Sequence, residues 1–298
     1  MMYVLKGLSL IGIVLCVFLM AKKTKEMAAS DEKDPVTGMT GKELIAFGKK
    51  KAPYTAIVGF VANFLDTLGI GSYAPTSAAF KLGKAVDDSL VPGTLNVGDT
   101  VPVCFEAFLF FGFVDMDMLT LVLMIVAAIL GSLVMAGIVS KFDRKKVRIS
   151  LFVGLFLLAT VILMKIMGVG PFGTVGTALG LTGAKLVIAV VGNFVLGALM
   201  SIGVGLYAPC MAMVLALGMD AGCAFLMAFG NGPKFIKEGK FDPICAWTQA
   251  IAGAAGVFVA YTFVSSIPLE LLTKVIAVIV YITAFLYLKD AIKKGSAA

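Results

Sequence analysis

The chain has 298 residues, of which 60% are hydrophobic and 14% are charged. Its mean hydropathy of +1.01 excludes a soluble globular protein. The net charge of +7 would suggest a nucleic-acid partner in a soluble protein, but here Lys and Arg gather in short connectors between apolar runs. Cytoplasmic loops of membrane proteins show this bias, so we expect no nucleic-acid partner and a lipid bilayer as the surroundings.

The longest apolar run, 186–219, has no charged residue in 34 positions. A helix rises about 1.5 Å per residue and the hydrocarbon core is about 30 Å thick, so such runs predict membrane-spanning helices. The runs are continuous and lack the short alternation of barrel strands. The predicted fold is an all-α polytopic membrane protein with about nine transmembrane elements.

The first candidate span covers residues 3–21 and has the length of a signal peptide. No small-residue cleavage site follows closely, and Lys22, Lys23 and Lys25 come at once, so we interpret the span as a retained anchor. The connector 22–51 is polar and is expected outside the membrane. Residues 1–51 thus form an anchor helix with its connector.

The core is predicted to be two repeats joined by a Gly/Thr-rich linker at 169–184. The first repeat, 52–168, and the second, 185–298, each contain four apolar elements. In the first repeat these are 52–80, 89–113, 118–140 and 149–168, and in the second 186–219, 221–233, 243–269 and 271–288.

A motif supports this duplication: GIGSYAP at 69–75 returns 134 positions later as GVGLYAP at 203–209. Aligning 58–75 with 192–209 gives eight identities in 18 positions, including both glycines, the tyrosine, the alanine and the proline. Chance composition explains matched alanines and valines but not this spacing. We interpret it as an internal repeat of about four helices.

Each motif lies near the centre of a long apolar run, which predicts a helix broken at mid-membrane. Glycine permits non-helical backbone, and proline fits the first turn of a new helix. Freed backbone groups are tolerated in a membrane only against protein or a wet cavity, so two breaks predict a cavity. Helices starting near each proline would direct their N–H groups at an anion. The expected substrate-binding residues here are Gly69, Gly71, Ser72, Tyr73, Pro75, Thr76, Gly203, Gly205, Tyr207 and Pro209.

A second pair of interruptions is predicted in 89–102 (SLVPGTLNVGDTVP) and 229–233 (FGNGP). They add Thr94, Asn96 and Asn231 to the expected substrate-binding residues, because paired discontinuous segments mark a transporter's site. The alternative is that these glycines only allow close helix packing. No Lys or Arg lies in 52–80 or 186–219, so the anion is expected to be held chiefly by neutral donors, with Lys81 and Lys84 affecting only its entry and the salt dependence of entry.

Carboxylates are the candidates for ion coupling, because the chain has no histidine. Asp66 stands alone in its apolar run three residues before the first break, and an intramembrane carboxylate is expensive enough to suggest function. Glu106 is expected to share the role, with a structural hydrogen bond as the alternative. Either carboxylate would bind a proton or sodium. Asp99 is expected to cap a resumed helix.

No cofactor, metal site or catalytic residue is expected. The five cysteines lack paired metal-ligand spacing. An intramembrane serine protease needs histidine, and no Tyr-Asp or Gly-x-Gly-Asp pair of an aspartyl type is present. We therefore expect no enzymatic activity.

The segments GIGSYAPTSAAFKLG, PGTLNVGDT and the run from FGFVDMDM to ATVILM resemble the repeat of the sulfite exporter TauE/SafE family. The resemblance covers about residues 52–290 in both halves, although the family's GxGGG-like run is replaced here by GIGSY and GVGLY. It implies a multi-pass permease or exporter of a small anion such as sulfite, a sulfonate or another organosulfur compound, in a bacterial cytoplasmic membrane. An ion-coupled carrier of another small solute, such as a carboxylate, is the alternative. Oligomeric state stays open.

Membrane orientation also stays open. If every element spans, the halves run parallel and the basic connector 141–148, with five positive residues, lies opposite 22–51, 234–240 and 289–294, which carry fourteen. A non-spanning hairpin in one half would relieve this conflict, and 221–233 is too short to span.

Overall fold

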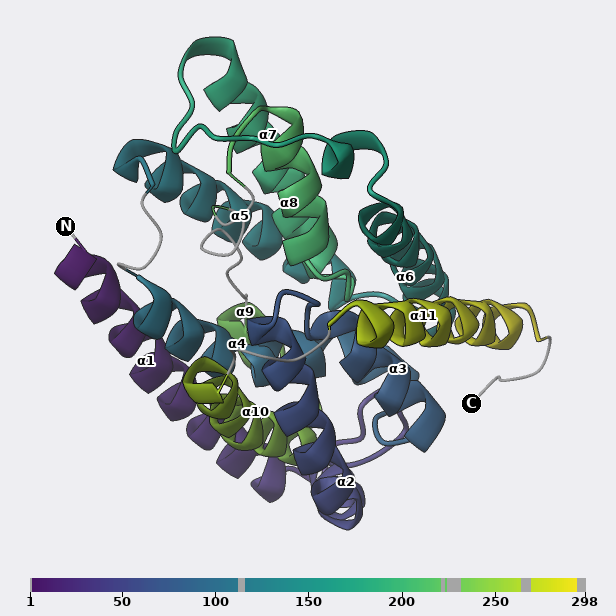
Figure 1. Cartoon of the computed structure of the whole chain (residues 1–298). Coiled ribbons are helices and arrows are strands. Elements are labelled where there is room, and N and C mark those ends of the chain that lie inside the picture. The colour runs from purple at the N-terminus through teal and green to yellow at the C-terminus, as the bar shows by residue number, and fades with distance from the viewer. Residues whose placement is uncertain (1, 112–115, 221–222, 224–231, 264–268, 294–298) are drawn as a thin grey trace.

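The computed structural model describes residues 2–111, 116–220, 223, 232–263 and 269–293. This part of the chain is helical and contains no strand (Figure 1). Five segments in it are long and apolar enough to cross a membrane: Tyr3–Ala29, Met118–Val139, Arg144–Gly173, Gly183–Met200 and Pro243–Thr262. The prediction of an all-α membrane protein is confirmed at this level.

The α-helices are α1 (Met2–Ala29), α2 (Gly41–Thr67), α3 (Tyr73–Gly83), α4 (Val91–Phe110), α5 (Met118–Val139), α6 (Arg144–Met167), α7 (Gly183–Met200), α8 (Tyr207–Ala216), α9 (Gly232–Glu238), α10 (Pro243–Phe263) and α11 (Leu269–Ile292). Two 3-10 helices are η1 (Asp88–Leu90) and η2 (Gly170–Gly173). The non-helical connector is shorter than the predicted 22–51, because α1 continues to Ala29 and Thr40 starts α2. Thr40 and Glu43 form a reciprocal capping box there.

Helices α2 and α3 form an antiparallel hairpin, which we call the first hairpin (residues 51–83). Near the middle of α2, the Lys51 Nζ donates to the Gly83 carbonyl at 3.1 Å and the Tyr54 hydroxyl donates to the Ala79 carbonyl at 2.8 Å. The end of α3 therefore lies beside the middle of α2. The chain runs along α2 to the GIGSY break, turns there, and returns along α3 beside α2.

Helices α7 and α8 form a second hairpin (residues 185–217) of the same kind. The Lys185 Nζ donates to the Leu217 carbonyl at 3.0 Å, so the end of α8 lies beside the start of α7. Lys185 and Leu217 each follow their counterparts Lys51 and Gly83 by 134 positions, the same separation as between the two glycine motifs. The two hairpins thus repeat one contact as well as one motif.

The first hairpin begins and ends on a face rich in ion pairs, which we call the charged face. There the Arg144 Nη2 donates to the Val36 carbonyl and to Asp87 Oδ2, both at 3.0 Å, and Lys240 pairs with Asp34. Burial raises the pKa of Asp34, but the hydrogen bond from Lys240 and two backbone N–H bonds outweigh it, so the pKa lies below its usual value.

The start of α6 and the C-terminal end of α11 lie on the same face. The Arg148 Nε donates to Asp88 Oδ2 at 2.7 Å, and the Lys81 Nζ donates to Asp290 Oδ2 at 2.6 Å. If every element spanned, connector 141–148 would lie opposite the other basic connectors, but it lies on the same face as the connector at 30–40, Lys240 and the end of α11. The physical reason is the first hairpin, which returns to its face of entry instead of spanning.

The second hairpin begins on the opposite face, which α5 and α6 connect to the charged face. The N–H of Asp117, at the start of α5, donates to the Leu179 carbonyl at 2.7 Å, and the N–H of Ala178 donates to the Gly218 carbonyl at 3.1 Å. Helix α5 has 22 residues and so separates the two faces by about 33 Å. The hairpins enter from opposite faces, whereas full spanning would have made the halves parallel.

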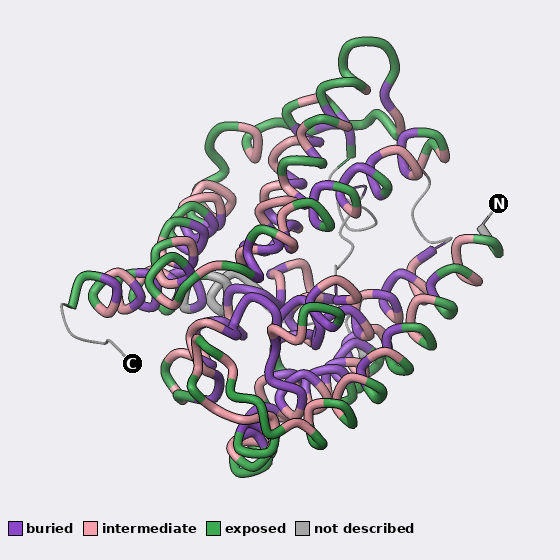
Figure 2. The backbone as a smooth tube through the Cα atoms, turned by 180° about the vertical axis from the view of Figure 1, so that it is seen from behind, coloured by how far each residue is buried: buried purple, intermediate pink, exposed green. Residues whose placement is uncertain are grey.

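Helix packing follows the same correspondence between halves. Helix α2 packs against α10 and α7 packs against α5, while α3 packs against α11 and α8 against α6. The helices of the two halves correspond as α2 to α7, α3 to α8, α5 to α10 and α6 to α11. Replacing each helix by its counterpart turns the α2–α10 pair into the α7–α5 pair and the α3–α11 pair into the α8–α6 pair. Seen from behind, the buried segments lie where the hairpins meet, and the outer helix faces are exposed (Figure 2). Exposed apolar side chains such as Val134 and Ile188 suit contact with lipid.

Helix α4 runs without interruption from Val91 to Phe110, so the predicted break in 89–102 is wrong. Pro92 lies at the start of the helix, where its missing N–H costs nothing, and Pro102 is accommodated inside it. Helix α4 is buried against α1 and α10, and this packing outweighs the low helix propensity of its Gly, Pro and Thr residues. Of the predicted counterpart 229–233, residues 229–231 lie outside the described part.

Candidate functional site

Both predicted breaks exist, and each is shorter than its motif. The first separates Thr67 from Tyr73, and Gly69 and Gly71 have φ angles of +81° and +96°, which favour glycine. The second separates Met200 from Tyr207, with Gly203 at φ +91°. Residues 69–72 and 203–206 are therefore non-helical as predicted, whereas 73–75 and 207–209 are already helical. Each proline is the third residue of its helix.

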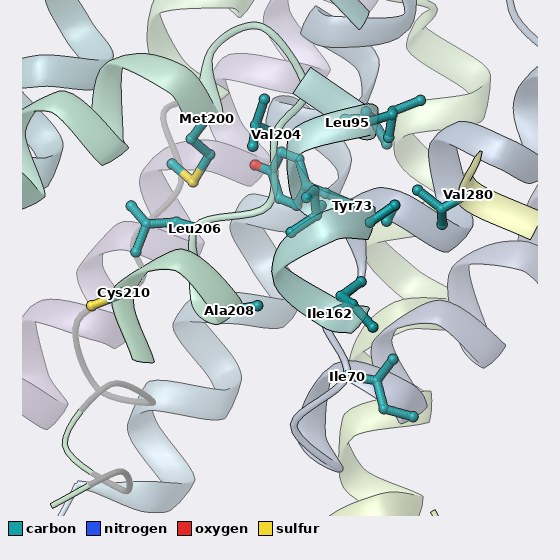
Figure 3. Packing of buried hydrophobic residues seen from close by; sticks show 14 of the residues in the cluster. Ile70, Tyr73, Leu95, Ile162, Met200, Val204, Leu206, Ala208, Cys210 and Val280 are labelled. Carbon is teal, nitrogen blue, oxygen red and sulfur yellow. The ribbon is translucent and has the colours of Figure 1, made fainter. Parts of the chain in front are cut away.

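The two breaks pack against each other. A Cβ placed on Gly69 would lie 3.1 Å from the Tyr207 hydroxyl oxygen, and one on Gly205 would lie 3.4 Å from the Tyr73 Cβ. The tyrosine of each motif thus lies against a glycine of the other. Figure 3 shows Tyr73 directed toward Val204 and Met200 of the second break.

Asn96 of α4 joins the two breaks through hydrogen bonds. Its Oδ1 accepts from the Tyr73 hydroxyl at 3.3 Å, and its Nδ2 donates to the Met200 carbonyl at 3.2 Å. The same Nδ2 donates to the Pro92 carbonyl at 2.8 Å. The structure therefore places Asn96 at the site, as predicted, although α4 is not broken there.

The half-length helices α3 and α8 bring their N-termini to the same depth. They contain 11 and 10 residues, or about 16 and 15 Å of helix, which is about half of the hydrocarbon thickness. Because they end on opposite faces of the molecule, their N-termini meet between the two faces. Neither helix has a side-chain N-cap. Two positive dipole ends with uncapped N–H groups therefore point into one region.

Lys165 of α6 also lies at the breaks, and the sequence analysis did not assign it to the site. Its Nζ donates to the Gly69 carbonyl at 2.9 Å and lies 5.6 Å from the centroid of the Tyr207 ring. Among the described residues it has no carboxylate partner. Lys165 therefore adds one positive charge at the breaks, while the holding of an anion chiefly by neutral donors stays a prediction. The glycine motifs could not have identified Lys165, because it reaches the breaks from another helix that lies far from them in sequence.

Asp66 and Asp99 converge on the Ser72 hydroxyl at the tip of the first hairpin. The Ser72 Oγ lies 2.7 Å from Asp66 Oδ2 and 3.1 Å from Asp99 Oδ2. Asp99 Oδ1 accepts from Asn63 Nδ2 at 3.1 Å and from Gln249 Nε2 at 2.6 Å. The predicted capping role of Asp99 is wrong, because Asp99 lies fully buried inside a continuous helix.

Glu106 lies two turns beyond Asp99 on α4. It is buried beside Thr67, within electrostatic range of Asp66 and Asp99, and its Oε1 has no hydrogen-bond partner. The structure thus brings both predicted coupling residues to one buried cluster and adds Asp99. Sequence reasoning missed the supporting amides of Asn63 and Gln249, because the contact between α2, α4 and α10 is non-local.

The remaining predicted residues differ in their surroundings. The Thr94 hydroxyl has a structural role, because it donates to the Leu90 carbonyl and accepts from the Asp242 N–H. Thr76 is buried with no partner for its hydroxyl. A Cβ on Gly71 would meet open space, whereas one on Gly203 would lie 2.8 Å from Leu151. Asn231 lies outside the described residues.

Three clefts in the described part of the chain are lined by residues outside both breaks. One of about 410 Å³ on the charged face includes Lys81 and Lys84. Lys81 is ion-paired with Asp88 at 2.8 Å as well as with Asp290, so it holds α3 to its neighbours. The expectation that Lys81 affects only anion entry stays a prediction, and Lys81 has a structural role besides. A cavity between the breaks stays a prediction.

In the described residues no group of three or more His, Cys, Asp or Glu side chains is arranged to hold a metal ion. The five cysteines are buried and form no disulfide bond. Comparison with known proteins found no matching family model, no matching curated protein and no matching solved structure.

Proposed function

We propose that the protein is a membrane carrier for a small anion, bound where the two hairpins meet. The observation that carries this proposal is the meeting of two uncapped helix N-termini between the two opposite faces of the molecule. Discontinuous helices in inverted halves are typical of transporters, and their N-terminal ends are directed at anionic substrate groups.

The contents of the site favour an oxyanion. Backbone N–H groups and the Thr76 hydroxyl offer neutral donors, and Lys165 adds one positive charge. Lys165 donates to a neutral carbonyl oxygen and lies beside the Tyr207 ring. An oxygen-rich anion would accept from the same ammonium group a hydrogen bond in which both partners are charged.

The repeated contacts and helix pairing support an internal duplication with inverted halves. Together with the resemblance to the TauE/SafE repeat, they favour sulfite, sulfonates or other organosulfur anions. Because cytoplasmic faces carry the excess of Lys and Arg, we assign the charged face to the cytoplasm of a bacterial inner membrane. Asp66 and Glu106 are the proposed coupling residues, with a proton or sodium as the coupling ion.

The test is anion flux in proteoliposomes containing the purified protein. Sulfite, a small sulfonate and a small carboxylate are compared under the same imposed gradients. We expect saturable flux of sulfite or the sulfonate, and its loss in Gly71→Leu, which places a large side chain in the open space at the first tip. Selective carboxylate flux would favour the alternative carrier, and no flux of any anion would contradict the proposal.

A further inference from the structure

The buried polar cluster at the first hairpin contains more hydrogen-bond acceptors than donors. Its carboxyl groups are Asp66, Asp99 and Glu106, and in the described residues none of them pairs with Lys or Arg. Three further acceptor sites lack a donor: Asn63 Oδ1, Gln249 Oε1 and Glu106 Oε1. All three of these side chains are more than nine-tenths buried. Buried acceptors without donors are costly, so the cluster calls for a positively charged ligand.

The number of hydrogens available at Ser72 indicates that this ligand is a proton. A serine hydroxyl carries one hydrogen, yet the Ser72 Oγ lies at hydrogen-bond distance from both Asp66 Oδ2 and Asp99 Oδ2. Two ionised carboxylates on one hydroxyl would repel each other in a region of low dielectric constant. A hydrogen on one carboxyl, donated to the Ser72 oxygen, satisfies both contacts.

The distances disfavour a metal cation in this position. The contacts of 2.7 and 3.1 Å are direct oxygen–oxygen hydrogen bonds, and the described residues include no group of three or more His, Cys, Asp or Glu side chains that could hold a metal ion. Among the described residues, the titratable groups near the cluster are Tyr73 of α3 and Tyr207 of α8, while Lys165 of α6 contacts the adjacent Gly69 and α10 contributes the neutral amide of Gln249.

We propose that Asp66 and Asp99 share one exchangeable proton through Ser72, that Glu106 is the next acceptor, and that protons rather than sodium drive the carrier. In the transfer, one aspartic acid gives its proton to the Ser72 oxygen as Ser72 passes its own hydrogen to the other aspartate. No net charge moves out of the cluster in this step. The coupling part rests on the proposed function, whereas the proton site does not.

The proton site is tested by infrared spectroscopy of the purified protein in lipid nanodiscs without substrate. We expect a protonated-carboxyl band at neutral pH that is lost in Asp99→Asn and shifted in Ser72→Ala, while Ser72→Thr, which keeps the hydroxyl, retains it. Thr283→Ala is the matched control, because Thr283 is a buried hydroxyl that donates only to its own helix. A band that is absent in the wild type, or unchanged in both Ser72→Ala and Asp99→Asn, overturns the proposal.

Coupling is then measured as sulfite accumulation in proteoliposomes under a pH gradient or a sodium gradient. A pH gradient should drive accumulation, and Ser72→Ala should reduce it about tenfold or more, as expected for losing a hydrogen bond to a charged group. Accumulation driven by sodium alone overturns the proposal. A carboxyl band that responds as expected, without flux of any anion, supports the proton site and contradicts the anion carrier.

Discussion

The two hairpins share a backbone plan but differ at their tips. Both have a long helix, a glycine break and a half-length helix starting at a tyrosine, and both are closed by a lysine on a carbonyl. The first tip carries Asp66 and Ser72 where the second carries Met200 and Leu206. The duplicated frame thus keeps two helix ends for the anion, while only the first tip is equipped to hold a proton.

This difference has a physical basis. A carboxyl group inside a membrane is expensive, and one kept without an ion pair is more plausibly functional than structural. The second tip supplies apolar packing, since Met200, Val204 and Leu206 are buried in the main core cluster. We therefore expect substitutions at matching positions of the two tips to have unequal effects.

The largest difference is expected at positions 66 and 200. Asp66→Asn should abolish gradient-driven sulfite accumulation, because the amide cannot bind and release a proton. Met200→Leu should leave accumulation within about twofold of wild type, because it conserves apolar volume. Flux in proteoliposomes is the measurement, with size-exclusion profiles to verify folding. Full accumulation by a folded Asp66→Asn protein would show that Asp66 is structural.

The positive charge between the tips should matter for binding. Lys165→Met should weaken the apparent sulfite affinity about tenfold or more, as for loss of a charge-assisted hydrogen bond. Lys84→Met on the charged face is the matched control and should alter only the salt dependence of entry. The concentration dependence of flux distinguishes the two. Equal affinities in the Lys165 variant and the wild type would remove Lys165 from the site.

The glycines should differ in backbone strain. Gly71→Ala should lower stability by about 1–2 kcal/mol, because a Cβ at φ +96° is disfavoured although nothing lies within 4 Å of it. Gly205→Ala has no positive φ and meets only ordinary contacts at 3.4 and 3.5 Å, so it should cost less. Thermal unfolding in detergent measures both. The opposite ranking would contradict the assigned backbone conformations.

The closing lysines should give the smallest difference. Lys51 and Gly83 form a partly buried contact, and Lys51→Met should cost about 1 kcal/mol, whereas the exposed contact of Lys185 should contribute a few tenths. The same unfolding assay compares Lys51→Met with Lys185→Met. Equal losses would indicate that solvent does not weaken the second contact.

The sequence predicted the breaks well, because glycine spacing and proline position report directly on local backbone. It left open whether the chain turns back, since a break marks where a helix stops but not the direction in which the next helix runs. That direction follows from the Lys51 and Tyr54 contacts with α3. Loop charges alone left the orientation open for the same reason.

The site was predicted in part. Asp66 was identified because a lone carboxyl in an apolar run is conspicuous. Asp99 was misread because the Gly, Pro and Thr residues around it indicate a break, whereas burial of α4 keeps the helix intact. Lys165 and Gln249 reach the site from α6 and α10, and contacts between helices so distant in sequence leave no local pattern.

The opposed insertion of the hairpins is the central claim, and cysteine labelling from each side of the membrane tests it most directly. The native cysteines are buried, so a thiol reagent that does not cross the membrane will report mainly on introduced cysteines. Lys84→Cys, at the end of the first hairpin, should react from the same side as Lys146→Cys. Lys185→Cys, at the start of the second hairpin, should react only from the other side, together with the exposed Val175→Cys. Reaction of Lys84→Cys and Lys185→Cys from one and the same side would contradict the account.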